Sequence, residues 1–196
     1  MESRRRELYF ISAVLAATVA GGAYFAFRYR APTPQKFAAH IETWFESPKM
    51  TAELMRERYG NPDVLAPGIA TWYERGPWKR VTVHGGSPFS YLEQVVGYHV
   101  PLDAVVPLRE FGHGLSFDVA NEELSSTSNS EPSNVLALNL ANELASGKIT
   151  PKEATAIYKR TSETSVAGKS SPYMEKLLFG TYRAVPQEPW NREIGY

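Results

Sequence analysis

Residues 8–27 are a run of 20 amino acids without a charged side chain, bounded by Glu7 and Arg28. As an α-helix such a run spans about 30 Å, which is the thickness of the hydrocarbon layer of a bilayer. Tyrosines lie near both ends of the run, where their amphipathic rings favour the boundary between lipid and water. The sequence therefore predicts a transmembrane helix over residues 8–27, preceded by a basic tail at residues 1–7.

A cleaved signal peptide is the alternative interpretation of this segment. Three arginines, Arg4, Arg5 and Arg6, precede an apolar stretch at residues 11–20, as they would in an export signal. The small residues that could form a cleavage site match the required pattern poorly, and the apolar run continues to Phe27. We therefore expect the segment to be retained as an anchor.

Small side chains recur at four-residue spacing along the predicted membrane helix. Lipid tails give apolar helices no hydrophobic reason to associate, so membrane helices commonly pack where small residues let their backbones approach. The expected partner-packing residues are Ala13, Ala16, Ala17, Ala20 and Gly21.

The rest of the chain predicts an α+β fold: a small antiparallel sheet packed with an αα-hairpin, in a domain at residues 37–179. A proline-containing linker at residues 28–36 joins this domain to the membrane helix. In chain order, the hydrophobic patterns and turn residues predict helices at 37–45 and 51–59, strands at 69–75, 78–84 and 91–100, a helix at 101–111, a strand or a pair of strands at 115–124, and helices at 134–145, 150–164 and 172–179.

Two further segments are expected to lie outside this core. Residues 125–133 (SSTSNSEPS) are too polar to pack and predict an exposed loop. Residues 180–196 contain two prolines and predict an extended tail. In that tail, Trp190 and Tyr196 are the aromatic residues that we expect to contact a partner.

Composition argues against several classes of function. The chain has 21 basic and 21 acidic side chains, whereas nucleic-acid-binding domains usually carry a basic excess. It has no cysteine, which excludes disulfides, thiolate metal sites and a cysteine nucleophile. Its histidines are isolated in sequence, unlike the close pairs typical of zinc sites. They are His40, His84, His99 and His113.

Phosphate-binding and hydrolase motifs are incomplete. Residues 167–170 (AGKS) resemble the end of a P-loop, but Glu163 stands where the first glycine of that motif would be. The Gly-x-Ser-x-Gly motif of α/β-hydrolases is absent from the sequence. We therefore expect no cofactor, no metal site and no enzymatic activity.

Several short motifs carry a resemblance. Four stretches resemble an uncharacterised family of small bacterial proteins: residues 50–59 (MTAELMRERY), 76–80 (GPWKR), 92–101 (LEQVVGYHVP) and 134–142 (NVLALNLAN), the last followed by Gly147 and Lys148. The resemblance covers residues 50–158. No activity is known for that family, so the resemblance implies no functional residue.

Together these features predict a protein of the bacterial inner membrane that crosses it once. The consecutive arginines at 4–6 favour a cytoplasmic N-terminus, which would place the domain in the periplasm. The leading hypothesis is an accessory or structural subunit of a larger integral-membrane complex, by analogy a respiratory or photosynthetic one. Its expected partners are other membrane subunits and the lipid bilayer, and not nucleic acid. The alternatives are a tethered module that binds a small molecule or lipid, and an unrecognised enzyme.

Overall fold

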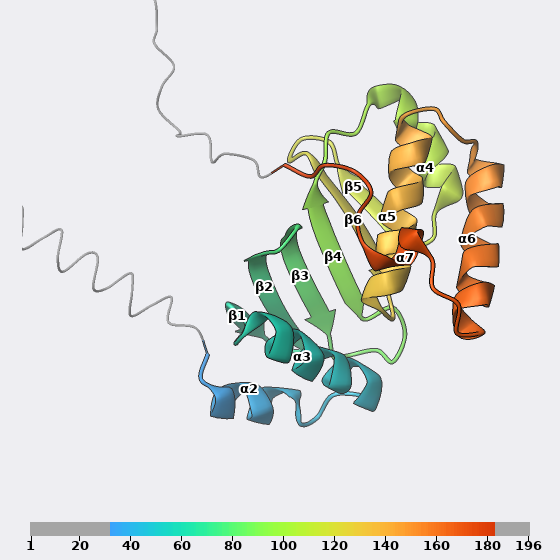
Figure 1. Cartoon of the computed structure of the whole chain (residues 1–196). Coiled ribbons are helices and arrows are strands. Elements are labelled where there is room, and N and C mark those ends of the chain that lie inside the picture. The colour runs from blue at the N-terminus through green and yellow to red at the C-terminus, as the bar shows by residue number, and fades with distance from the viewer. Residues whose placement is uncertain (1–31, 183–196) are drawn as a thin grey trace, which may run out of the picture.

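The computed structural model describes residues 32–182, so the predicted membrane helix and residues 183–196 lie outside the described part. Its centre is an antiparallel six-stranded sheet with the strand order β1-β2-β3-β4-β6-β5 (Figure 1). The strands are β1 (Val64–Ala66), β2 (Ile69–Arg75), β3 (Trp78–His84), β4 (Leu92–Gly97), β5 (Leu115–Asp118) and β6 (Glu123–Ser128). The α+β class and the antiparallel sheet expected from the sequence are therefore confirmed.

Helices cover the sheet in two groups. The helical segments are α2 (Pro34–Ile41), α3 (Glu46–Tyr59), the 3-10 turn η1 (Leu102–Ala104), α4 (Val105–Phe111), α5 (Glu131–Ala145), α6 (Pro151–Val166) and α7 (Pro172–Glu175). The first group consists of α2 and α3, which lie beside β2 and β3 (Figure 1). The second group is centred on α5, which lies on β4 and β6. The remaining helices α4, α6 and α7 pack on α5 and form an outer layer.

The register of the sheet explains which side chains enter the core. Trp72 is opposite Val81, Val81 is opposite Gln94, and Gln94 is opposite Ser126, so these four share the face that meets the helices. All four are fully buried. The opposite face is polar, because the neighbouring row across the same strands is Thr71, Thr82, Glu93 and Thr127.

α5 is enclosed between the sheet and the outer helices. Every residue from 134 to 141 is buried, so this helix is apolar on nearly all sides rather than amphipathic. The next helix, α6, begins with a complete capping box, in which the Thr150 side chain accepts from the Glu153 backbone N–H and Glu153 accepts from the Thr150 N–H. The predicted αα-hairpin is therefore formed by α5 and α6.

The structure differs from the predicted elements in several places, beginning with the first helix, which is α2 (Pro34–Ile41) rather than residues 37–45. Residues 125–128 are strand β6 rather than an exposed loop, and Ser125 and Ser126 are buried. Helix α3 begins at Glu46 and includes Pro48 in its first turn, where a missing N–H costs nothing. Helix α7 is one turn long, shorter than expected, and the short strand β1 was not expected.

Within residues 32–182, no helix is both long and apolar enough to cross a membrane.

Candidate functional site

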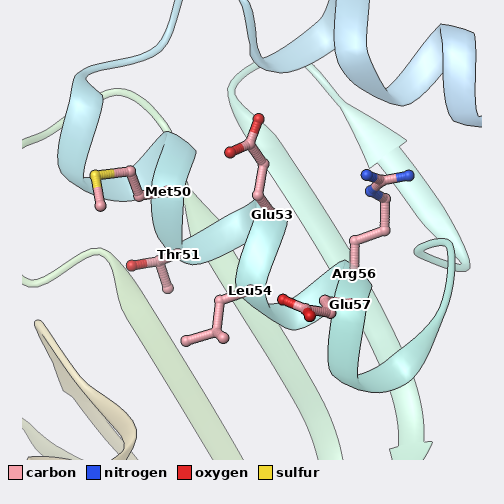
Figure 2. Close-up of a pocket in the computed structure, with 6 residues that line it drawn as sticks. All are labelled: Met50, Thr51, Glu53, Leu54, Arg56 and Glu57. Atoms are coloured by element: carbon pink, nitrogen blue, oxygen red, sulfur yellow. The ribbon is translucent and has the colours of Figure 1, made fainter.

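The outward side of α3 is an exposed apolar surface beside a hollow. Ala52 and Met55 point into the core and are fully buried, whereas Met50 and Leu54 are 60% and 48% exposed. Since Met50 and Leu54 are one helical turn apart, they lie next to each other on the surface. The hollow has a volume of about 840 Å³ and is lined by Met50, Thr51, Glu53, Leu54, Arg56 and Glu57 (Figure 2).

Carboxylates lie along one side of this apolar pair. At 100° per residue, Glu46, Glu53 and Glu57 fall within 60° of Met50 on the same side of the helix, away from Leu54. None of the three forms an ion pair with another residue in the range 32–182. We call Met50, Leu54 and these three glutamates the α3 surface.

The two arginines of α3 are engaged elsewhere. The guanidinium of Arg58 is 2.6 Å from a carboxylate oxygen of Glu131 on α5. The guanidinium carbon of Arg56 lies 5.3 Å from the centroid of the Phe37 ring on α2, within range of a cation–π contact. Lys49 lies three residues after Glu46 and four before Glu53 on the same helix, and Arg56 also lines the hollow, so the apolar pair is bordered by charges of both signs.

A second hollow lies on the polar face of the sheet. It has a volume of about 430 Å³ and is lined by Arg80, Glu93, Ser116, Phe117, Asp118, Val119, Glu123 and Ser125. Its charges compensate one another, since Glu123 is 2.7 Å from Lys79 and 3.6 Å from Arg80. Glu93 is 3.8 Å from Arg80 in turn. This compensation favours a structural ion-pair network over a binding site.

His113 lines a third hollow, of about 300 Å³, near the start of α5. Its ring stacks on Tyr158 at 4.2 Å between centroids and lies 4.6 Å from the ring of Phe111. Burial lowers the pKa of His113, so its imidazole is neutral near pH 7. Both His113 and Ser90, which lines the same hollow, have left-handed backbone conformations, with φ of 49° and 51°. Such conformations are concentrated at functional sites.

His99 meets Glu122, one of the contacts between a histidine and Asp118 or Glu122 that would favour the alternative of an unrecognised enzyme. Its Nδ1 is 3.0 Å from Oε1 of Glu122, and both side chains are exposed. The hydrogen bond with His99 is the largest cause of a lowered pKa of Glu122, and Tyr182 contributes as well. Because neither residue lines one of the three hollows, the pair lacks the enclosed surroundings of a catalytic acid–base pair.

Metal binding finds no support in the described part of the chain, where no group of three or more His, Cys, Asp or Glu could hold an ion. His84 lies at the end of β3 and His40 lies in α2, and both are apart from His99 and His113. Residues 167–170 follow the end of α6, and Gly168 there is not preceded by a strand. A P-loop would require that strand.

Two sets of predicted contact residues lie outside the described residues. They are the five membrane positions Ala13, Ala16, Ala17, Ala20 and Gly21, and the tail residues Trp190 and Tyr196. Both sets stay predictions. The sequence analysis did not single out the α3 surface, although the pattern of Met50 and Leu54 beside glutamates on a helix could have indicated it.

Comparisons with protein-family models, with curated proteins and with solved structures give no match for this chain.

Proposed function

We propose that this protein is a single-pass accessory subunit of a larger integral-membrane complex. The observation that carries the proposal is the uncharged 20-residue segment at 8–27, in which small residues recur at four-residue spacing. A segment of that length and composition inserts in a bilayer and offers a close-packing surface to other helices. The proposed location is the bacterial inner membrane, with the α+β domain in the periplasm.

The start of the described domain supports this arrangement. Only six residues separate Phe27 from Pro34, the first residue of α2, and they span at most about 25 Å. Phe37 and Ile41 of α2 are fully buried in the core of the domain. Because α2 is part of the core, the domain itself is held close to the end of the proposed anchor rather than on a long tether.

The chemistry of the domain supports a binding role over a catalytic one. Among residues 32–182, the hollow on the α3 surface is lined by side chains of α3 alone, and the polar hollow on the sheet holds compensated charges. Adjacent exposed apolar residues rimmed by polar ones favour a surface that contacts another protein.

The hollow beside His113 favours a second candidate function, which is a membrane-tethered module that binds a small molecule. A neutral imidazole stacked on Tyr158 and the hydroxyls of Ser128 and Ser133 supply both apolar and polar contacts. Calorimetric titration of the purified protein with small heterocyclic and polar ligands would test this candidate. Binding that a His113→Asn substitution abolishes would favour it.

Gentle detergent extraction of the full-length chain followed by native electrophoresis tests the main proposal. We expect the protein to migrate with other membrane subunits. Replacing Ala13, Ala17 and Gly21 with leucine should release it, because larger side chains separate the helix backbones. The matched control replaces Ile11 and Val19 with leucine, because at 100° per residue both lie at least 80° from the three replaced residues and should leave the assembly intact. Migration of the unaltered chain solely as a monomer would refute the proposal.

A further inference from the structure

The hollow beside His113 is built by five segments that are far apart in the sequence. They are the loop before β4, the turn before β5, the end of β6, and helices α5 and α6. Their lining residues are Ser90, His113, Gly114, Thr127, Ser128, Asn129, Ser133 and Tyr158. The volume of about 300 Å³ is at the lower end of the range for small-molecule pockets, so the hollow suits a ligand with a single ring.

Gly114 lets the turn that carries His113 lie directly against β6. A Cβ atom at position 114 would be 2.3 Å from the carbonyl oxygen of Thr127, and φ of Gly114 is 75°. The backbone N–H of Thr127 donates to the carbonyl of Gly114 at 3.0 Å. The shape of this wall therefore depends on glycine at position 114.

The other walls of the hollow are held in place as well. The backbone N–H of Ser90 donates to Oδ1 of Asn129 at 2.8 Å, which ties the loop before β4 to the end of β6. The His113 ring is held by its contacts with Tyr158 and Phe111. Because its lining is fixed in this way, the hollow would lose little conformational freedom when a ligand binds.

The lining is polar but uncharged near pH 7. None of the eight described lining residues is Asp, Glu, Lys or Arg. Sites for phosphate or carboxylate groups usually contain arginine or lysine, which form charge-assisted hydrogen bonds. The composition of the hollow therefore favours a neutral ligand.

Several hydrogen-bonding groups of the lining have no partner within residues 32–182. They are the hydroxyls of Ser90 and Tyr158, the amide nitrogen of Asn129 and the ring nitrogens of His113. Hydroxyls and a neutral imidazole each donate and accept. A ligand that carries several hydroxyls has the same double capacity, so it can pair with these groups in more than one arrangement.

An exposed aromatic ring lies next to this polar lining. Phe89 precedes Ser90 in the loop before β4, and its surface is 74% exposed. Its backbone is fixed, since the Phe89 N–H donates to the hydroxyl of Ser87 at 3.1 Å. The electron-rich face of an aromatic ring attracts C–H groups that carry partial positive charge, such as those on one face of a sugar ring.

We propose, building on the second candidate function, that the hollow beside His113 binds a neutral pyranose sugar. The hydroxyls of the sugar pair with Ser90, Asn129, His113 and Tyr158. Phe89 covers the C–H face of the sugar at the edge of the hollow. The site accepts one ring, either as a free monosaccharide or at the end of a longer saccharide.

Saturation-transfer difference NMR on the full-length chain tests this site, in a detergent whose headgroup carries no sugar. Glucose and N-acetylglucosamine are the probes, and adenosine and inorganic phosphate are the comparison ligands. At least one sugar should bind with a dissociation constant on the order of 1 mM, because the ligand is small and the hollow is open. Absence of transfer to both sugars would overturn the proposal.

Two substitutions remove different parts of the site without disturbing the core. Tyr158→Phe removes one hydroxyl and keeps the ring that stacks on His113, and Phe89→Ala removes the exposed ring. Each should weaken sugar binding about fivefold. The matched controls are Tyr73→Phe in β2 and Phe45→Ala before α3, whose residues are 44% and 53% exposed. Sugar binding that falls equally in the controls, or in none of the four variants, would contradict the site.

The linear trimer of N-acetylglucosamine separates the two sources of the sugar. Equal affinity for monomer and trimer would support a site for a free sugar or a chain end. A trimer that binds more than tenfold tighter would support a polysaccharide whose neighbouring rings also contact the domain.

The comparison ligands separate a wrong ligand class from a wrong function. If adenosine binds, the sugars do not, and His113→Asn abolishes that binding, the sugar assignment fails and the small-molecule module stands. Phosphate bound in place of sugar would likewise overturn the neutral ligand class. If none of these probes binds, the sugar assignment fails and the second candidate function loses its support. The subunit role is tested separately by native electrophoresis.

Discussion

Asn134 of α5 donates a hydrogen bond from its side-chain amide to the side-chain oxygen of Gln94 on β4, with 3.1 Å between Nδ2 and Oε1. The same amide donates to the carbonyl of Leu92 at 3.0 Å. Both side chains are fully buried. The contact therefore fixes the start of α5 against the centre of the sheet, in surroundings where an unpaired polar group is costly.

Replacing Asn134 with leucine should destabilise the domain by about 2–4 kcal/mol, because it leaves the oxygens of Leu92 and Gln94 buried without these donors. Ser126 is the matched control. Its hydroxyl is buried beside Gln94 but forms no hydrogen bond within the described residues, so Ser126→Ala should change the free energy of unfolding by less than about 1 kcal/mol. Urea unfolding of both variants measures the difference. Equal losses in the free energy of unfolding would show that the hydrogen bonds of Asn134 do not stabilise the domain more than the Ser126 hydroxyl does.

Two adjacent glycines should respond differently to alanine. A Cβ atom at Gly85 would lie 2.0 Å from the indole of Trp44, whereas one at Gly86 would meet nothing within 4 Å. Gly85→Ala should therefore push Trp44 away from the sheet and cost about 1–3 kcal/mol. Gly86→Ala should be neutral or slightly stabilising, since it reduces the entropy of the unfolded chain. Thermal unfolding and tryptophan fluorescence of the two variants compare these effects. A similar loss for both would contradict the packing of Trp44 on Gly85.

His113 should contribute to acid sensitivity. Burial lowers its pKa in the folded protein, so the unfolded chain, with a pKa of about 6.5, binds the proton more tightly. The contribution of His113 to the free energy of unfolding is fully present above pH 6.5. It is lost as the pH falls through the pKa that His113 has in the folded protein. His113→Asn removes it and tolerates the positive φ at this position. Between pH 7.5 and pH 5, the unaltered protein should therefore lose more stability than the variant in urea unfolding. Parallel losses would show that His113 is not responsible.

The proposed topology can be checked with single cysteines, because the chain has none of its own. Ser3→Cys lies before the proposed anchor, and Lys152→Cys lies at an exposed position of α6. After the outer membrane is opened, a membrane-impermeant maleimide should label position 152 and leave position 3 unlabelled until the inner membrane is disrupted. The reverse pattern would place the domain in the cytoplasm.

Local signals made much of the fold predictable. The hairpin of β2 and β3 follows from two alternating runs around a Gly-Pro turn, and the capping box of α6 from Thr150 and Glu153. Residues 125–128 of β6 were assigned to a loop because their serines and threonine resemble a loop in composition. Only the pairing with β4 and β5, which satisfies the backbone groups, makes Ser125 and Ser126 suitable for a buried strand.

The candidate site was less predictable than the fold. The approach of His99 to Glu122 depends on the end of β4 and the turn before β6, which are 23 residues apart in sequence. The α3 surface depends on the orientation of α3 against β2 and β3, since periodicity alone did not show which residues would stay exposed. Tertiary packing therefore determines both features.

The outermost strands of the sheet have few residues: β1 has three and β5 has four. An edge of that length offers few unpaired backbone groups to which a second chain could add a strand. Many copies of the domain could therefore be crowded side by side without joining edge to edge into aggregates.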